Sequence, residues 1–186
     1  MIIVVNCKVK RTIYDPNEII IKYDYAEVVL YNKDGNEVDR AIIDIEDVER
    51  VSSFKWGLSQ GYAKNNKNGF FLHNLLMDCK GVDHIDRNPL NNRKSNLRRC
   101  NQSQNISNSK IPVHNTSGFK GAYFNKNRGV WQSYINKNKK HIYLGAFKTK
   151  IAAAEAYNKA AKEYHGEFAS KNDIRLMGVM AVPYTI

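Results

Sequence analysis

The chain has 186 residues, 42% hydrophobic and 25% charged, a length typical of one domain or of two small ones. Its 29 basic and 18 acidic residues give a formal charge of +11. The longest apolar runs have four or five residues, as in Ile2–Val5, which excludes a membrane span. Residues 1–10 lack the features of a secretory signal. Three widely spaced cysteines exclude a disulfide scaffold and a cysteine zinc site, so we expect a cytoplasmic protein with reduced thiols.

The positive charge increases along the chain. Residues 1–72 contain 10 basic and 11 acidic side chains, residues 73–110 contain 7 and 3, and residues 111–186 contain 12 and 4. A neutral first part and a basic last part predict a polyanionic partner for the last part.

Residues 1–69 are expected to form a β-rich accessory region. An Ile-, Val- and Tyr-rich segment, 18–31, is followed by an Asp-Gly turn and a return strand at 38–45. A short helix is expected at 46–53, and another strand at 61–64. Nothing in this region indicates catalysis.

Residues 70–110 contain the residues that suggest chemistry. A strand, the loop 87–96, a second strand at 97–100 and a helix at 102–108 are expected in that order. The polar residues singled out are Asp83, His84, Asn96 and Asn105. Aspartate and asparagine oxygens suit a hard divalent ion such as Mg²⁺, and a neutral imidazole beside it suits a general base. A cluster of arginines would hold phosphates nearby: Arg87, Arg93, Arg98 and Arg99.

These residues occur in five ordered blocks. The blocks are Leu72-His73, Val82-Asp83-His84-Ile85-Asp86, Asn88-Pro89-Leu90-Asn91-Asn92-Arg93, Ser95-Asn96-Leu97-Arg98 and Gln104-Asn105. In order and spacing they resemble the core of HNH endonucleases, in particular the phage and intron-type homing enzymes whose third motif residue is Asn. The resemblance implies a ββα-metal fold around one divalent cation, Mg²⁺ or Mn²⁺.

The resemblance also assigns roles to residues. It makes His84 the general base, Asp83 and Asn105 the metal ligands, and Asn96 the residue that orients His84 through its carbonyl. It gives His73 an accessory role.

Two features of the sequence do not fit the family pattern simply. The family usually has glycine where this chain has Arg87, so a positive φ there would strain the turn. Asp83 and His84 are sequential, so on a regular strand they would point to opposite faces. Both can reach one phosphate only if the strand ends or bulges there.

After a linker at 111–116, residues 117–173 are expected to form three strands, 120–124, 130–135 and 141–147, packed on one helix. The helix is expected to start after Thr149 and to end before Gly166. Alternation places Trp131, Ser133 and Ile135 on the face that packs against the helix and leaves the polar face to solvent or to a DNA groove.

Several motifs in this segment, including Tyr143-Leu144-Gly145-Ala146-Phe147-Lys148-Thr149, resemble the plant Apetala/ethylene-response-factor DNA-binding domain. That resemblance implies a sheet that lies in the major groove. The residues expected to contact DNA are Lys120, Tyr123, Asn125, Arg128, Gln132, Tyr134, Asn136, His141 and Tyr143. The segment 174–186 is an apolar tail that either packs on this domain or mediates self-association.

Together these observations predict an α+β protein that is a metal-dependent endonuclease of double-stranded DNA, with no membrane association and no protein partner. The alternative is a non-catalytic DNA-binding regulator with a decayed nuclease core. An RNA-directed nuclease or RNA-binding protein is a third hypothesis, which the absence of a recognisable single-strand stacking motif argues against.

Overall fold

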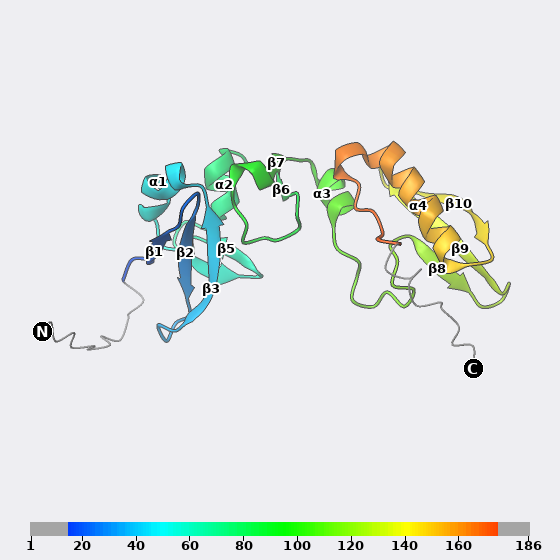
Figure 1. Ribbon diagram of the computed structural model, residues 1–186, viewed down its shortest axis with the longest axis horizontal. Coiled ribbons are helices and arrows are strands. Elements are labelled where there is room, and N and C mark those ends of the chain that lie inside the picture. Colours follow the sequence, from blue (N-terminus) through cyan, green and yellow to red (C-terminus); the bar gives the residue numbers. More distant parts are fainter. Residues whose placement is uncertain (1–14, 175–186) are drawn as a thin grey trace, which may run out of the picture. The chain divides into compact units, whose positions relative to one another are not determined.

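The computed structural model describes residues 15–174, and the tail predicted at 174–186 lies outside the described residues apart from Ile174. The chain forms two compact units, 1–99 and 100–186. Helices and antiparallel strands occur in both, which confirms the α+β class (Figure 1). No helix of the described part is both long and apolar enough to cross a membrane.

The first unit is built on a three-stranded antiparallel sheet with the order β1-β2-β3. Its strands are β1 (Ile19–Ile21), β2 (Ala26–Tyr31) and β3 (Glu37–Ile43). The expected hairpin is confirmed, because the Asp34-Gly35 turn joins β2 to β3. The Ile-, Val- and Tyr-rich segment 18–31 contains two strands, β1 and β2, which pair with each other. Strand β2 is central and contributes buried Val28, Val29 and Leu30 to the core.

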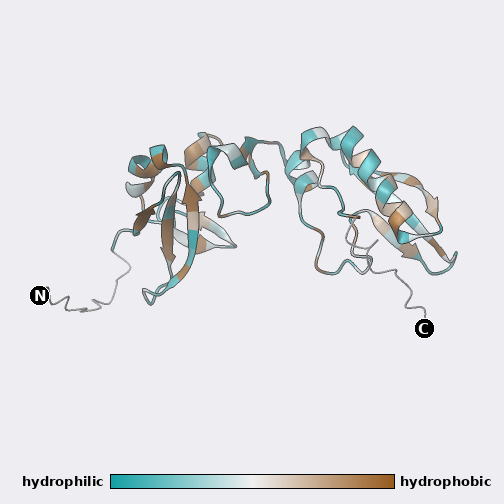
Figure 2. Ribbon diagram, viewed as in Figure 1, coloured by the Kyte–Doolittle hydropathy of each residue, from teal (hydrophilic) through white to brown (hydrophobic). Residues whose placement is uncertain are grey.

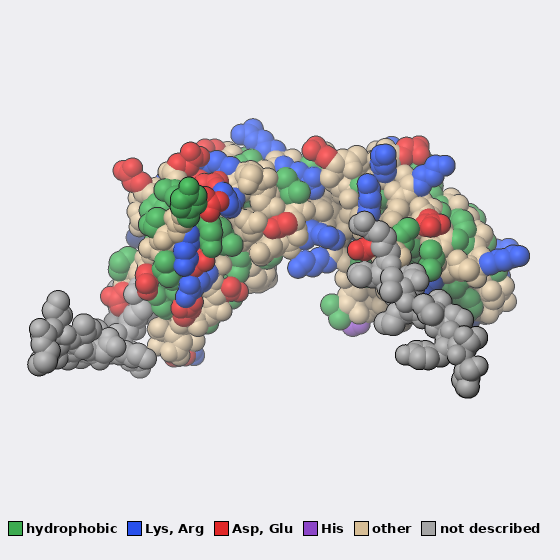
Figure 3. All heavy atoms as spheres, viewed as in Figure 1, with side chains coloured by type: hydrophobic (Ala, Val, Ile, Leu, Met, Phe, Trp, Pro, Cys, Tyr) green, Lys and Arg blue, Asp and Glu red, His purple; other side chains and the backbone are tan. Residues whose placement is uncertain are grey.

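Short elements cover this sheet and complete the core, in which Trp56, Leu72 and Leu76 are buried. They are η1 (Ile45–Asp47), α1 (Val48–Ser52), β4 (Gly57–Ser59), β5 (Tyr62–Lys64), α2 (Leu72–Met77), β6 (Val82–His84), η2 (Lys94–Asn96) and β7 (Leu97–Arg99). Brown, hydrophobic ribbon is concentrated on β1 and β2 in Figure 2. On the surface of this unit basic and acidic side chains alternate (Figure 3), and Arg40 pairs with Glu27 and Glu37 there.

The second unit contains α3 (Gln102–Asn108) and a sheet of β8 (Ala122–Asn125), β9 (Val130–Lys137) and β10 (Lys140–Phe147), with β9 in the centre. Helix α4 (Lys150–His165) covers one face of the sheet (Figure 1) and is followed by η3 (Gly166–Phe168). The predicted caps are confirmed. Thr149 Oγ1 accepts the Ala152 amide, and α4 ends at Gly166 with φ +55°.

The alternation predicted for the sheet is also confirmed. Ser133 and Ile135 are buried against α4, where Tyr157, Ala160 and Ala161 pack. Tyr123 and Tyr143 on the other face remain about half exposed. The second unit therefore has one buried sheet face and one open, polar and aromatic face.

Helix α3 belongs to the second unit, although the sequence grouped it with residues 70–110. The Lys120 ammonium donates hydrogen bonds to the Ser107 and Ser109 carbonyls, both at 2.8 Å, at the C-terminal end of α3. Ser107 Oγ lies 3.2 Å from Nδ1 of His165 at the end of α4. These contacts fix α3 to the sheet and to α4. The Lys120 ammonium, which was expected to contact DNA, therefore makes hydrogen bonds within the protein.

Gly121 allows the closest approach between α4 and the sheet. It has φ +77°, and an added Cβ would lie 2.0 Å from Cδ2 of Tyr157 and 2.7 Å from the Tyr134 carbonyl oxygen.

We expect Gly121→Ala to lower the free energy of unfolding by about 3 kcal/mol or more, because the ring and the backbone have to move. Gly129→Ala is the matched control, with φ +63° and no atom within 4 Å of the added Cβ. It should cost only about 1 kcal/mol. Urea unfolding of both variants measures the difference, and equal losses would contradict the packing described.

Candidate active site

The candidate site lies on the β6–β7 hairpin. Strand β6 ends at His84, as the use of two sequential residues at one site requires. Asp83 is opposite Arg98 in the hairpin, and His84 is opposite Leu97. The side chains of Asp83 and His84 are both buried, with exposed fractions of 5% and 6%.

The His84 ring is positioned by Asn92, a residue that the sequence reasoning did not single out. Nε2 of His84 lies 3.2 Å from Oδ1 of Asn92. Because an amide oxygen only accepts hydrogen bonds, Nε2 carries the hydrogen and Nδ1 holds the lone pair. Asn92 is fully buried and donates its Nδ2 to the Leu90 carbonyl at 3.0 Å. The ring therefore has a defined tautomer, with Nδ1 as the basic nitrogen.

The backbone of β3 supports Asn92. The Asn92 amide donates to the Ile42 carbonyl and the Ile42 amide donates to the Leu90 carbonyl, each at 2.7 Å. This pairing forms a parallel bridge between Ile42 and Asn91. The region predicted as accessory thus holds the loop that orients His84.

A second histidine and two aromatic rings surround His84. The His73 ring lies perpendicular to it with centroids 5.1 Å apart, Tyr62 lies 5.9 Å away, and Phe71 stacks on His73 at 5.4 Å. Burial and the neighbouring His84 lower the pKa of His73 to about 4. Burial also lowers the pKa of His84, against the opposing effects of Asn92, Asp86 and Asp83. Both imidazoles are therefore neutral at pH 7.

Asp83 forms an ion pair with Arg98. Nε and Nη2 of Arg98 donate to Oδ2 of Asp83 at 2.9 and 2.6 Å, and both side chains are largely buried. Arg98 was expected to hold phosphate, but its charge is used to balance Asp83.

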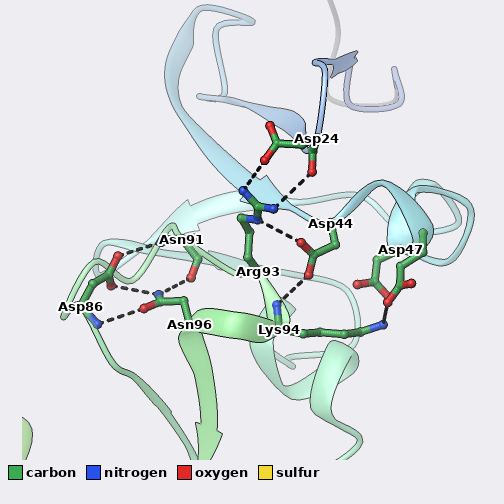
Figure 4. A network of polar contacts seen from close by, with 9 residues as sticks. Asp24, Asp44, Asp47, Asp86, Asn91, Arg93, Lys94 and Asn96 are labelled. Atoms are coloured by element: carbon green, nitrogen blue, oxygen red, sulfur yellow. Dashed lines mark hydrogen bonds and ion pairs between the residues drawn. The ribbon is translucent and has the colours of Figure 1, made fainter.

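Asn96 organises the loop between the strands. Its Oδ1 accepts the Asp86 amide at 2.9 Å, and its Nδ2 donates to Asp86 Oδ1 and to the Asn91 carbonyl (Figure 4). The Asn96 backbone carbonyl accepts the Ile85 amide at 2.9 Å, directly after His84, and its expected role in orienting His84 stays a prediction. Burial raises the pKa of Asp86, but hydrogen bonds from Asn88, Asn91 and Asn96 outweigh this effect and hold the pKa below its usual value.

The other arginines of the predicted phosphate cluster differ in their surroundings. Arg93 binds Asp44 and Asp24, each at 3.0 Å, and so joins the loop to the N-terminal sheet (Figure 4). Arg87 is exposed and has φ +63°, the strained conformation that the missing glycine predicts. Arg99 is exposed, with one nitrogen 3.5 Å from the Met77 carbonyl. Arg87 and Arg99 therefore present their side chains to solvent, unlike Arg93 and Arg98.

In the second unit, the residues predicted to contact DNA lie on or beside the open sheet face, and several bond to one another. Gln132 Oε1 accepts from Asn125 Nδ2 at 3.1 Å and from the Tyr134 hydroxyl at 3.3 Å. His141 Nδ1 lies 2.6 Å from Asn136 Oδ1. Arg128 is exposed in the β8–β9 turn, and its amide donates to Asn125. Tyr123 and Tyr143 complete the face.

The predicted metal ligands are hard oxygen donors in two different units. Asp83 lies on β6, and Asn105 lies exposed on α3, where no hydrogen bond of its side chain occurs within residues 15–174. In the described part of the chain, no group of three or more His, Cys, Asp or Glu side chains is placed to hold a metal ion. Carboxylate and amide oxygens have the chemistry that suits Mg²⁺.

Comparison with known proteins finds two relatives that each match less than half of the chain. Protein 3.8 of Escherichia phage T7 is 36% identical over 89 residues, 47% of this chain and 72% of that protein. The AP2-like ethylene-responsive transcription factor TOE2 of Arabidopsis thaliana is 39% identical over 61 residues, 33% of this chain and 13% of that protein. No family model and no solved structure matches the chain.

A third relative covers most of both chains. The uncharacterized HNH endonuclease L560 of Acanthamoeba polyphaga mimivirus is 32% identical over 145 residues, 72% of this chain and 75% of that protein. The chain therefore belongs to the same family as this viral protein, which is named an HNH endonuclease.

Proposed function

We propose that the protein is a metal-dependent endonuclease that hydrolyses phosphodiester bonds in double-stranded DNA. The observation that carries the proposal is the His84 imidazole, which is neutral at pH 7, held in one tautomer by Asn92, and adjacent to the Asp83 carboxylate. A general base needs to be unprotonated and correctly oriented before the substrate arrives. The name of the mimivirus relative supports the same class of reaction.

In this proposal, Nδ1 of His84 takes a proton from the attacking water. Asn92 keeps the other ring nitrogen protonated, and Asn96 holds the loop that carries Asn92 in place. Asp83 would contribute an oxygen ligand to Mg²⁺ or Mn²⁺, which would stabilise negative charge on the phosphate and on the leaving oxygen. Arg87 and Arg99 carry exposed positive charges and would contact the DNA backbone.

The open sheet face of the second unit is proposed to bind the double-stranded DNA. It presents tyrosine, glutamine and asparagine side chains of the kind that contact base edges and phosphates. The similarity of this segment to a plant transcription factor supports DNA as the partner. The proposal includes no protein partner.

One observation favours the alternative of a DNA-binding regulator without nuclease activity. Arg98 already neutralises Asp83, so a cation would compete with an ion pair at that carboxylate. The two functions differ in whether DNA is cut in the presence of a divalent ion.

The nuclease proposal predicts the effect of removing the base. His84→Ala should reduce the rate of supercoiled plasmid relaxation in Mg²⁺ or Mn²⁺ by about 10²–10⁴-fold, because proton removal from water is lost. Asp83→Ala should reduce it as well, whereas Asp34→Ala, in an exposed turn, should not. Gel-shift binding and melting temperature of each variant report retained DNA affinity and folding. Cleavage that persists in EDTA or in the His84 variant would contradict the proposal. Specific DNA binding with no cleavage of a genomic library would support the regulator.

Asn92 has a separate prediction as a positioning residue. Asn92→Ala should lower kcat for cleavage by about 10–100-fold with little change in KM, because the His84 ring loses its orienting acceptor. Asn68→Ala, in an exposed turn, is the control. A variant that loses DNA affinity and thermal stability as much as kcat would show that Asn92 has only a structural role.

The neutral histidine pair predicts a pH dependence of stability. The unfolded chain takes up a proton at residue 73 near pH 6.5, but folded His73 does so only near pH 4. Stability should therefore be complete above pH 6.5 and be lost as the pH falls toward 4, by about 2 kcal/mol between pH 7 and pH 5. Urea unfolding at the two pH values in EDTA measures this. His73→Phe should flatten the dependence, and an unchanged slope would show that His73 is not buried in its neutral form.

A further inference from the structure

A cavity of about 380 Å³ opens in the second unit between the open sheet face and the segment that follows α3. This volume is within the range of small-ligand sites. Its lining includes Tyr123, Tyr134, His141, Tyr157 and His165. All its lining residues lie between 106 and 165, within the second unit.

Tyr157 supplies a hydrogen-bond donor on the wall of this cavity. The residue is 4% exposed, and no hydrogen bond of its hydroxyl occurs within residues 15–174. A phenol on a cavity wall can donate a hydrogen bond to a molecule that enters the cavity. Burial, with a smaller contribution from Tyr123, raises the pKa of Tyr157 to about 12, so the group remains a hydrogen-bond donor at neutral pH.

Gly121 makes room for this ring. Because Gly121 has no side chain, the Tyr157 ring can lie directly against it. A Cβ at this position would lie only 2.0 Å from Cδ2 and 2.6 Å from Cε2 of the ring. Tyr157 belongs to α4, on the covered side of the sheet, whereas Tyr134 and His141 belong to the open face. The ring therefore lies against Gly121, directly before β8, where a side chain would clash with it.

The walls of the cavity suit a flat, aromatic ligand. Tyr134 and His141 stack with centroids 4.6 Å apart and planes 15° apart, and Tyr123 lies 6.0 Å from Tyr134. Histidine rings add groups that both donate and accept hydrogen bonds, with His165 already held through Nδ1 by Ser107. Among residues 15–174, no carboxylate lines the cavity. Stacking surfaces with a few polar groups and no negative charge are the features that bind unpaired nucleobases.

We propose that this cavity binds a single nucleobase of an unpaired nucleotide, with the Tyr157 hydroxyl donating to an acceptor on the base edge. The inference rests on the proposed DNA partner of the second unit. A free nucleotide and an unpaired base in a strand offer the same chemistry. In DNA the cavity would take a base out of the stack, which is easiest at a mismatch, a bulge or a single strand.

The test uses full-length protein and the fluorescence of 2-aminopurine, as the free deoxynucleoside monophosphate, in a single-stranded 12-mer and in the matching blunt duplex. Tyr157→Phe should weaken binding of the single-stranded probe by about three- to tenfold, the size of one neutral hydrogen bond. Tyr164→Phe is the matched control, because it removes the same hydroxyl from the same helix outside the cavity. Melting temperatures of both variants should equal that of the wild type.

The outcomes distinguish a free nucleotide from an unpaired base in a strand. They also distinguish the cavity proposal from the nuclease proposal. Binding of both free nucleotide and single strand, or of the strand alone, supports the cavity and identifies its source. Equal binding by wild type and Tyr157→Phe, or displacement of the probe by inorganic phosphate alone, would overturn it. Plasmid cleavage is measured on the same samples. Cleavage without this binding would support the nuclease proposal and contradict the cavity proposal. Binding without cleavage would support the cavity proposal and contradict the nuclease proposal.

Discussion

The hydrogen bonds between β3 and the loop at Leu90–Asn92 are the constraint on which the candidate site depends. They place a fully buried amide against His84, and that amide fixes which ring nitrogen is basic. A loop rich in asparagine would otherwise have many ways to satisfy its own polar groups. Here its backbone bonds to β3 through a parallel bridge, which limits the positions that the Asn92 side chain can take. The N-terminal region is therefore part of the scaffold of the candidate site.

The second unit could be predicted closely because its signals are local. Alternating residues on β9, the Thr149 cap and the glycine after His165 each act over a few residues, and the structure follows them. The first unit depended more on distant pairings. Arg93 bonds to Asp24 and Asp44, 69 and 49 residues away, so its spacing among other arginines suggested a phosphate contact that its ion pairs do not provide. Asn92 lay within a recognised block, but nothing local distinguishes it from Asn91.

The boundary between the units shows the same difference between local and distant information. Helix α3 was expected at 102–108, and a capping box of Asn101 and Gln104 forms at its start. Its contact with the sheet comes from Lys120, twelve residues beyond the helix, whose ammonium binds carbonyls at the C-terminal end of α3. A cation at this end is favoured by the helix dipole and satisfies acceptors that the helix leaves unpaired. A basic side chain of the second unit can therefore stabilise the fold, and charge alone does not identify a DNA contact.

The Asp83–Arg98 pair has a consequence for metal binding. Burying a lone carboxylate beside two histidines would be costly, and these histidines stay neutral and supply no charge. Arg98 supplies that charge from the adjacent strand, with Nε and Nη2 donating to Oδ2 of Asp83. The pair therefore balances the charge that burial of Asp83 would otherwise leave uncompensated. The same pair opposes the proposed cation, because a cation at Asp83 would meet a carboxylate whose charge Arg98 already offsets.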